Sequence, residues 1–207
     1  ANLLGFEQFS GLSLATKMAE SPDAVMTFLL DLSNHSKSVA EQDFDDIARY
    51  GLEALGLSSI HPWDVAFCGD RLKRHRFDLS DEDLRPYFPV QKVIDGLFEI
   101  VQRIFGIEVI PVTDMSVWHP DVTTYLIRRQ GVPLARFYFD LYARAKKRGG
   151  AWMADCRCRR QDPAHGLTLP VAFLTCNFAP PVNDQPALLS HDDVVTLFHE
   201  FGHGLHH

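Results

Sequence analysis

The sequence changes character at Gly106, and this change limits the folds that the chain can adopt. Before Gly106, apolar residues recur at helical spacing, as in residues 90–105, and the Ser-Pro-Asp run at residues 21–23 is typical of a helix start. After Gly106, β-branched and aromatic residues dominate. We therefore expect an α+β, mainly helical chain in two parts, a helical segment at residues 1–106 and a sheet with a final helix at residues 107–207.

The β-rich half predicts a small antiparallel sheet that ends near residue 180. Two runs with strand character, residues 121–129 and 132–144, are separated by Gln130-Gly131, which is typical of a hairpin turn. The last strand is expected in LPVAFLTCNF, residues 169–178. Two roles are open for this strand. At the edge of the sheet it would bind an extended peptide through main-chain hydrogen bonds, and at the centre it would be buried.

Composition and charge argue against several classes of function. The chain has 27 acidic and 20 basic residues and a formal net charge of −7, so no nucleic-acid partner and no anionic membrane surface is expected. It contains no run of about eighteen apolar residues, which a membrane span requires. Four cysteines are too few for a disulfide scaffold, and Cys156 and Cys158 are expected to be buried or half-buried thiols in a reducing compartment.

The chain ends in LFHEFGHGLHH, which contains a His-Glu-x-x-His pattern. Two histidines four residues apart lie on one face of a helix, so His199 and His203 can both bind one zinc ion at about 2.0–2.1 Å. Glu200 lies between them and can act as the general base toward a water activated by zinc, passing the proton to a leaving amine. The pattern therefore predicts hydrolysis of a peptide bond, although a histidine pair without a metal remains an alternative.

The rest of this helix is expected to pack against a core. The hydroxyl of Ser190 can cap its N-terminus, and Asp192 and Asp193 in its first turn interact favourably with the helix dipole. The apolar residues at helical spacing are Val194, Val195, Leu197, Phe198, Phe201 and Leu205. Packing on this side would present the two histidines to a cleft.

No convincing third zinc ligand follows from the sequence, although catalytic zinc uses three protein ligands and a water. The metzincin pattern requires glycine where this chain has His206, and His207 lies about 12 Å along the helix from His199, too far to share one ion. Asp140 and Asp155 remain upstream alternatives. We expect instead a carboxylate on another helix.

Blocks along the whole chain resemble one family. They are SLATKMAESP, HPWDVAF, RPYFPVQKVIDGLFEIVQRIFGI, VWHPDV, FYFDLYARAKKRGGAWM, LPVAFLTCNFAPPV and HDDVVTLFHEFGHGLHH. In order, they are similar to the thimet oligopeptidase family of zinc metallopeptidases, and particularly to its bacterial oligopeptidase A branch.

This resemblance implies a larger, helical, bilobed zincin-type peptidase that hydrolyses short peptides in the cytoplasm. It assigns zinc binding to His199 and His203 and general-base catalysis to Glu200. The family's third ligand is a glutamate beyond the motif, and its transition-state donors lie further on, so this chain is expected to be an incomplete fragment. Two alternatives stay open: a non-catalytic helical fragment or binding module that does not retain zinc, and a closed structural zinc site. The oligomeric state is left open.

Overall fold

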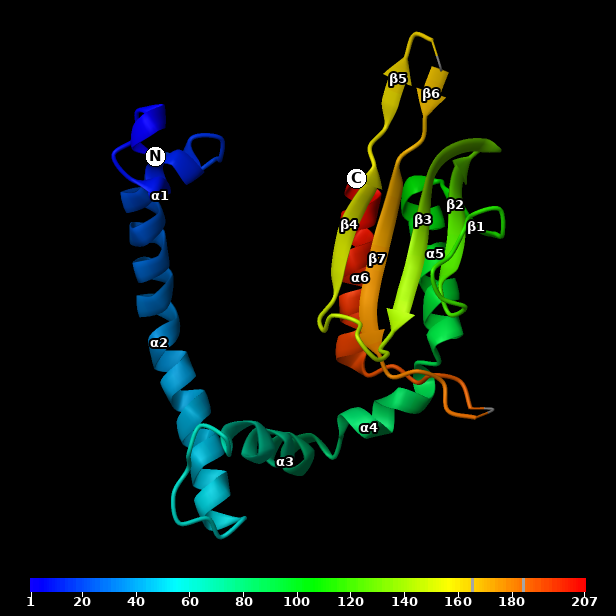
Figure 1. The fold of residues 1–207 in the computed structure, drawn as a ribbon. Coiled ribbons are helices and arrows are strands. Elements are labelled where there is room, and N and C mark those ends of the chain that lie inside the picture. Colours follow the sequence, from blue (N-terminus) through cyan, green and yellow to red (C-terminus); the bar gives the residue numbers. More distant parts are fainter. Residues whose placement is uncertain (165, 184) are drawn as a thin grey trace. The chain divides into compact units, whose positions relative to one another are not determined.

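The chain divides into two compact units, Ala1–Leu79 and Ser80–His207. The structure is a computed structural model, and it describes residues 1–164, 166–183 and 185–207 (Figure 1). Secondary structure changes at Gly106, whereas packing changes near residue 80, because the helix before Gly106 shares its core with the sheet. The two units are described in turn.

The first unit is helical. Ser21 caps its long helix, as the sequence predicts, because the Ser21 hydroxyl accepts a hydrogen bond from the backbone N–H of Ala24 at 3.1 Å. The C-terminal part of this helix packs on the next long helix, where Gly51 lies against the side chains of Ile60 and Cys68. The helices are η1 (Asn2–Leu4), α1 (Phe9–Leu14), α2 (Pro22–Glu53) and α3 (Val65–Phe77).

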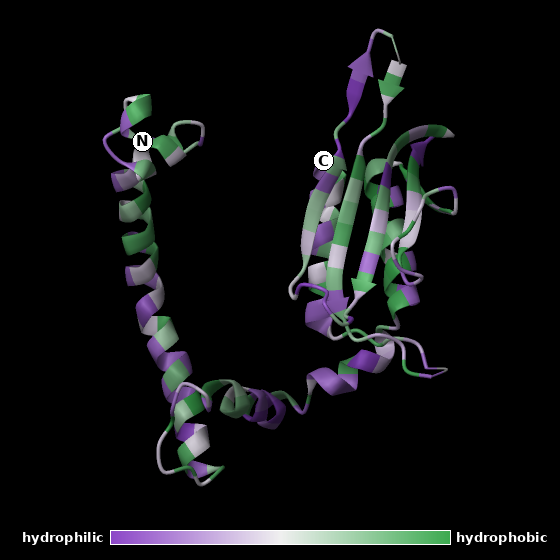
Figure 2. Cartoon of the chain, in the orientation of Figure 1, coloured by the Kyte–Doolittle hydropathy of each residue, from purple (hydrophilic) through white to green (hydrophobic). Residues whose placement is uncertain are grey.

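Much of α2 exposes apolar side chains within the described residues. Hydrophobic residues recur along α2 (Figure 2). Among them, Phe28, Leu29, Leu32 and Val39 are exposed. Only the part of α2 near Gly51 is covered by α3.

The second unit begins with short helices and then the strongly amphipathic helix α5. The prediction of a helix that ends at Gly106 is confirmed, because Gly106 adopts the left-handed conformation, with φ of 64°, that ends helices. The helices of this unit are α4 (Asp81–Leu84), η2 (Arg85–Tyr87), α5 (Val90–Phe105) and α6 (His191–His206).

The sheet is mixed, so the prediction of an antiparallel sheet is wrong in one pairing. Five strands follow the order β1-β2-β3-β7-β4, and β3 pairs with β7 in parallel. The physical reason is the path of the chain. After β3 the chain forms β4, which does not pair with β3, and the later strand β7 then lies between β3 and β4 and pairs with both. The strands are β1 (Glu108–Val112), β2 (Thr123–Arg129), β3 (Val132–Tyr142), β4 (Trp152–Arg157), β5 (Arg160–Asp162), β6 (Gly166–Thr168) and β7 (Val171–Phe178).

This order also decides between the two roles left open for residues 169–178. Strand β7 is central, with partners on both sides, so the edge-strand interpretation of that segment is wrong. The edge on this side of the five-stranded sheet is β4, which pairs with β7 alone. The predicted hairpin is confirmed, because Gln130 and Gly131 both have positive φ, 50° and 79°, between β2 and β3.

The unit has two layers. Helices α5 and α6 cover one face of the five-stranded sheet (Figure 1). Alternate residues of β2, β3 and β7 belong to the core between the layers. The fully buried side chains include Leu97 of α5, Phe139 of β3, Leu174 of β7 and Phe201 of α6. Phe98 joins the layers through rings of Tyr125, Phe137, Phe139 and Phe201.

All four cysteines are free, but they differ in exposure. Cys68 and Cys176 are buried, whereas Cys156 and Cys158 are exposed, so the prediction that the latter pair is buried or half-buried is wrong. The reason is that they lie at and beyond the end of the edge strand β4, where the residues from Asp155 onward are exposed. Among the described residues, no helix combines the length and the apolar character that crossing a membrane requires.

Candidate active site

Helix α6 starts where its capping residues predict. The Ser190 hydroxyl accepts a hydrogen bond from the backbone N–H of Asp193 at 3.1 Å, and the Asp193 carboxylate accepts one from the backbone N–H of Ser190 at 2.9 Å. This reciprocal capping box satisfies two donors at the helix end. It fixes the start of the helix that carries all three predicted site residues.

The helix buries its apolar face against β7 and β4. Leu197 and Phe201 are fully buried, and Val194, Phe198 and Leu205 are packed against the core, as predicted. The prediction is wrong for Val195, which is 54% exposed. Val195 stands four residues before His199, so it lies on the histidine face of the helix rather than on the core face.

His199 and His203 come together on the exposed side of α6. Their Nε2 atoms are 3.1 Å apart, and their rings are nearly perpendicular, at 85°. Two donors of a tetrahedral zinc site with bonds of about 2.0–2.1 Å lie about 3.3 Å apart. The separation of the two Nε2 atoms therefore fits two adjacent ligand positions of a tetrahedral zinc ion.

Glu200 lies on the inner side of the same turn. It is 8% exposed and is one of the few charged residues buried in this unit. Burial raises the pKa of the Cys176 thiol on β7 to about 12, and the nearby Glu200 carboxylate adds to the increase. The Glu200 carboxylate thus occupies a buried position near Cys176 of β7.

The described residues hold no third ligand beside this pair. Within residues 1–164, 166–183 and 185–207, no three His, Cys, Asp or Glu side chains form a group that could hold a metal ion. Asp140 bonds to Arg144, Lys147 and Trp118 instead, and Asp155 is an exposed residue of β4.

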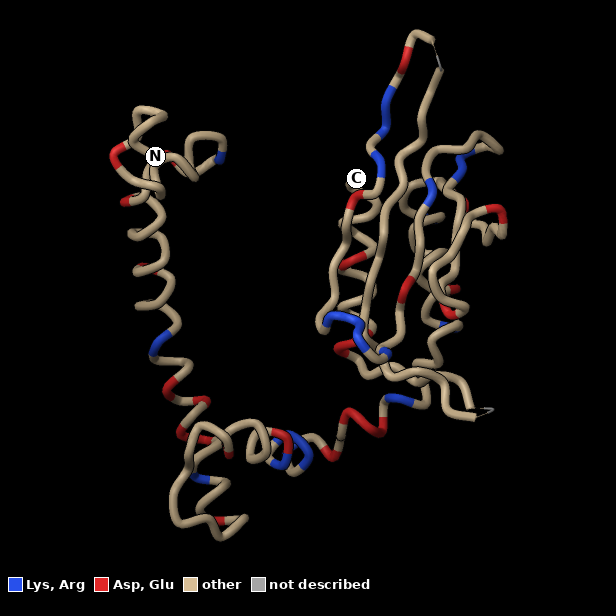
Figure 3. The backbone as a smooth tube through the Cα atoms, viewed as in Figure 1, with Lys and Arg blue, Asp and Glu red and all other residues tan. Residues whose placement is uncertain are grey.

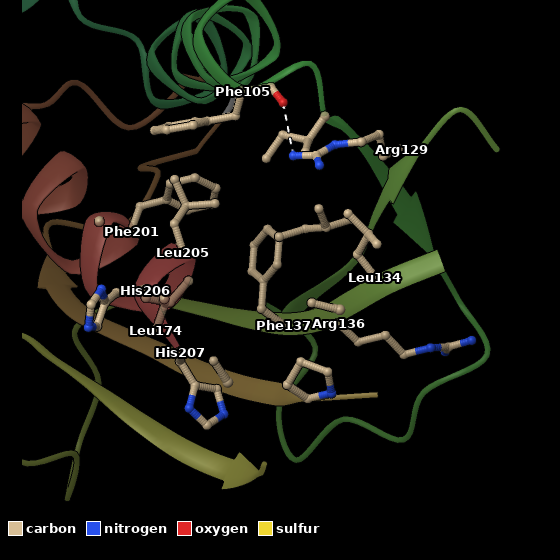
Figure 4. Close-up of a pocket in the computed structure, with 17 residues that line it drawn as sticks. Phe105, Arg129, Leu134, Arg136, Phe137, Leu174, Phe201, Leu205, His206 and His207 are labelled. Carbon is tan, nitrogen blue, oxygen red and sulfur yellow. Dashed lines mark hydrogen bonds between the residues drawn. The ribbon is translucent and has the colours of Figure 1, made fainter. Parts of the chain in front are cut away.

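The two histidines after the motif have other surroundings, as predicted. His206 is exposed, and the Nε2 atom of His207 lies 3.2 Å from the backbone oxygen of Arg157. Both line a pocket of about 570 Å³ between the end of α5, strands β2 and β3, and the last turns of α6 (Figure 4). This pocket is largely apolar and does not include His199, Glu200 or His203.

The sequence did not reveal which strand is the edge beside α6. Strand β4 has unpaired main-chain groups on its outer side and contacts α6, so its Trp152–Arg157 segment is a candidate surface for an extended ligand. No local signal distinguishes this strand from β7, because its edge position results from the later insertion of β7. This candidate element is the one that sequence reasoning missed.

A helix with an i, i+4 histidine pair and an intervening glutamate, packed on a sheet with a free edge, is the class of site found in zinc-dependent peptidases. Comparison with known proteins agrees with this class. The pattern of Peptidase family M3 matches residues 1–207. The chain belongs to this family.

The chain is similar to several peptidases that are longer than it is. The chain is 49% identical over 208 residues to oligopeptidase A of Escherichia coli strain K12, 40% identical over 215 residues to the probable cytosolic oligopeptidase A of Arabidopsis thaliana, and 38% identical over 208 residues to dipeptidyl carboxypeptidase of the same E. coli strain. In each case the whole chain is covered, together with 31%, 30% and 30% of the relative. The chain thus spans about a third of the length of these relatives.

Proposed function

We propose that this chain carries the catalytic helix of a zinc-dependent metalloendopeptidase that hydrolyses short oligopeptides. The observation that carries the proposal is the 3.1 Å separation of the His199 and His203 Nε2 atoms, with Glu200 buried one position along the same helix. Membership of Peptidase family M3 and the oligopeptidase names of the relatives support a peptide substrate.

In this mechanism each motif residue has a distinct task. His199 and His203 would hold the zinc ion, and a carboxylate outside residues 1–207 would supply the third protein ligand. When bound, zinc polarises a peptide carbonyl and makes a water more acidic. Glu200 accepts the proton of the attacking water and delivers it to the leaving amine nitrogen.

The edge strand β4 binds the substrate backbone in this proposal. An extended peptide can pair with unpaired N–H and C=O groups on the outer side of Trp152–Arg157, which lies against α6. A cytoplasmic location belongs to the proposal and accords with four free thiols and with the printed name of the Arabidopsis relative.

The test is the zinc content of the complete protein after dialysis against metal-free buffer, together with hydrolysis of a short quenched peptide. We expect about one zinc per chain and activity that a chelator removes. His199→Ala should lose both, whereas Glu200→Gln should keep the zinc and lose activity. His206→Ala is the matched control, because this exposed histidine is on the same helix but outside the pair, and it should keep both.

The competing reading is a non-catalytic binding module that does not retain zinc. This alternative is favoured by one observation. Within the described residues only two ligands come together, and two ligands do not complete a catalytic zinc site. Zinc near zero in the wild type and in His199→Ala alike would support this alternative. Zinc that resists chelation without any hydrolysis would instead indicate a closed structural site.

A further inference from the structure

An ionic cluster with a buried centre lies on the sheet face opposite α5 and α6. Its centre is Asp140 on β3, which is 4% exposed. Arg144 donates hydrogen bonds to both carboxylate oxygens, at 2.6 and 2.8 Å, and Lys147 donates one at 2.9 Å. The indole N–H of Trp118 donates a further one at 3.0 Å and covers the group. The proposed mechanism uses none of these residues.

Lys147 ties this cluster to the backbone. Its ammonium group donates to the backbone oxygens of Asp140 and Tyr142, at 2.8 and 2.7 Å, as well as to the Asp140 carboxylate. An ammonium group has three donors, so these three acceptors satisfy it completely. The side chain is only 5% exposed, which means that the charge is held in one place rather than solvated.

The Asp140 carboxylate remains ionised in this setting. Burial raises its pKa, but the hydrogen bonds from Arg144, Lys147 and Trp118 outweigh burial and lower the pKa to about 2. The cluster is therefore intact throughout the neutral range.

The segment that these bonds hold leads directly into the edge strand. After β3, the chain crosses the end of β7 and enters β4, and Lys and Arg residues concentrate in this connection (Figure 3). The backbone N–H of Ala143 donates to the oxygen of Phe178 at 2.9 Å. The Asn177 side chain of β7 donates to the backbone oxygens of Arg148 and Gly150, at 2.8 and 2.6 Å. Both ends of the connection are thus hydrogen-bonded to β7.

We propose that Asp140, Arg144, Lys147 and Asn177 are positioning residues that fix the start of strand β4 and thereby set how tightly a peptide substrate binds beside α6. This inference rests on the proposed function. Strand β4 pairs on one side only, so its register at Trp152 opposite Thr175 depends on β7 and on the connection that delivers it. The four residues fix that connection, and we call these four residues the β4 clamp.

The clamp predicts a specific kinetic signature. His199, Glu200 and His203 are on α6, and the hydrogen bonds that Asp140, Arg144, Lys147 and Asn177 make go to other partners, so the chemical step should be little affected by loss of the clamp. Pairing of a substrate with β4 occurs in both the ground state and the transition state. Weakening such uniform binding raises KM and leaves kcat nearly unchanged.

The experiment compares Asp140→Asn and Asn177→Ala with the wild type in the complete, zinc-loaded protein. We expect KM for a short quenched peptide to rise about tenfold in Asp140→Asn and severalfold in Asn177→Ala, with kcat within about twofold. The control is Asp114→Asn, which removes an exposed carboxylate paired with Arg136 elsewhere in the same unit. That control should leave KM unchanged.

Hydrogen exchange gives a second readout that needs no activity. Amides of residues 143–157 should exchange faster in Asp140→Asn and Asn177→Ala, while those of residues 197–206 on α6 should keep the wild-type rate. If Asp140→Asn does not fold, Asn177→Ala decides the question, because it removes only the two bonds to the connection.

Several outcomes would overturn the inference. Unchanged KM in a hydrolysing enzyme, unchanged exchange in residues 143–157, or a fall in kcat together with lost zinc would each contradict the positioning role. Failure of the proposed function is distinct from these results, because the wild type itself would then show no chelator-sensitive hydrolysis. In that case the exchange rates of residues 143–157 alone decide whether the clamp fixes the start of β4.

Discussion

Two glycines of the motif helix, Gly202 and Gly204, offer a matched test of how closely α6 approaches the sheet. A methyl group added at Gly204 would lie 3.2 and 3.3 Å from the two terminal carbons of Leu174 on β7. A methyl group added at Gly202 would meet nothing within 4 Å. The two positions are in the same last turns of one helix, so they share nearly the same backbone environment.

The difference between two alanine substitutions isolates the contact with β7. Replacing glycine by alanine inside a helix stabilises it by up to about 1 kcal/mol, so we expect Gly202→Ala to raise the free energy of unfolding by several tenths to 1 kcal/mol. Gly204→Ala receives the same gain, but overpacking against the fully buried Leu174 costs about 1–3 kcal/mol. The two variants should therefore differ by about 1–3 kcal/mol, with Gly204→Ala neutral to destabilising.

The assay is urea unfolding followed by circular dichroism, with melting temperature as a second measure. At this chain length 1 kcal/mol corresponds to about 2–4 °C. Leu174→Val shortens the opposing side chain, so combining it with Gly204→Ala should recover part of the lost stability, whereas combining it with Gly202→Ala should be additive. Equal effects of the two alanine substitutions would refute the close approach of α6 to β7 at Gly204.

Two further predictions follow from charge and exposure. The pKa of Asp140, about 2, lies below its ordinary value of 3.8, so the carboxylate stabilises the fold above pH 3.8 and this contribution is lost as the pH falls through 2. The difference in unfolding free energy between the wild type and Asp140→Asn should accordingly shrink by about 2 kcal/mol on acidification, as measured by urea titrations at several pH values. Maleimide should label the exposed Cys156 and Cys158 in the native chain, but the buried Cys68 and Cys176 only after denaturation, as measured by mass spectrometry. Labelling of Cys176 in the native chain would contradict this prediction.

Local signals predicted the ends of helices and the tight turn correctly. Ser190 caps α6 through bonds within four residues, Gly106 ends α5 through its own φ, and Gln130-Gly131 turns the hairpin through two positive φ angles. Each of these features depends on residues adjacent in sequence, so a sequence contains the information directly.

Strand order could not be predicted in the same way. The insertion of β7 between β3 and β4 depends on contacts between segments that are far apart in the chain. The apolar run of LPVAFLTCNF does not specify which strands β7 pairs with. The parallel pairing of β3 with β7, the edge position of β4 and the exposure of Cys156 all follow from that one insertion. A single non-local event thus accounts for most of the differences between expectation and structure.

At the candidate site, too, some features depend on neighbouring residues of the motif and others on contacts between distant segments. The spacing of His199 and His203 on one helix is sufficient to bring their nitrogens to 3.1 Å, so this half of the proposed zinc site is encoded in five consecutive residues. The burial of Glu200 depends on β7, and the free edge beside α6 depends on where the connection after Asp140 delivers β4. A helix with the same pentapeptide but without this sheet would hold the histidine pair, yet it would have neither a buried carboxylate nor a surface to align a peptide. Activity should therefore be more sensitive to residues that order β4 and β7 than their distance from the motif in sequence suggests.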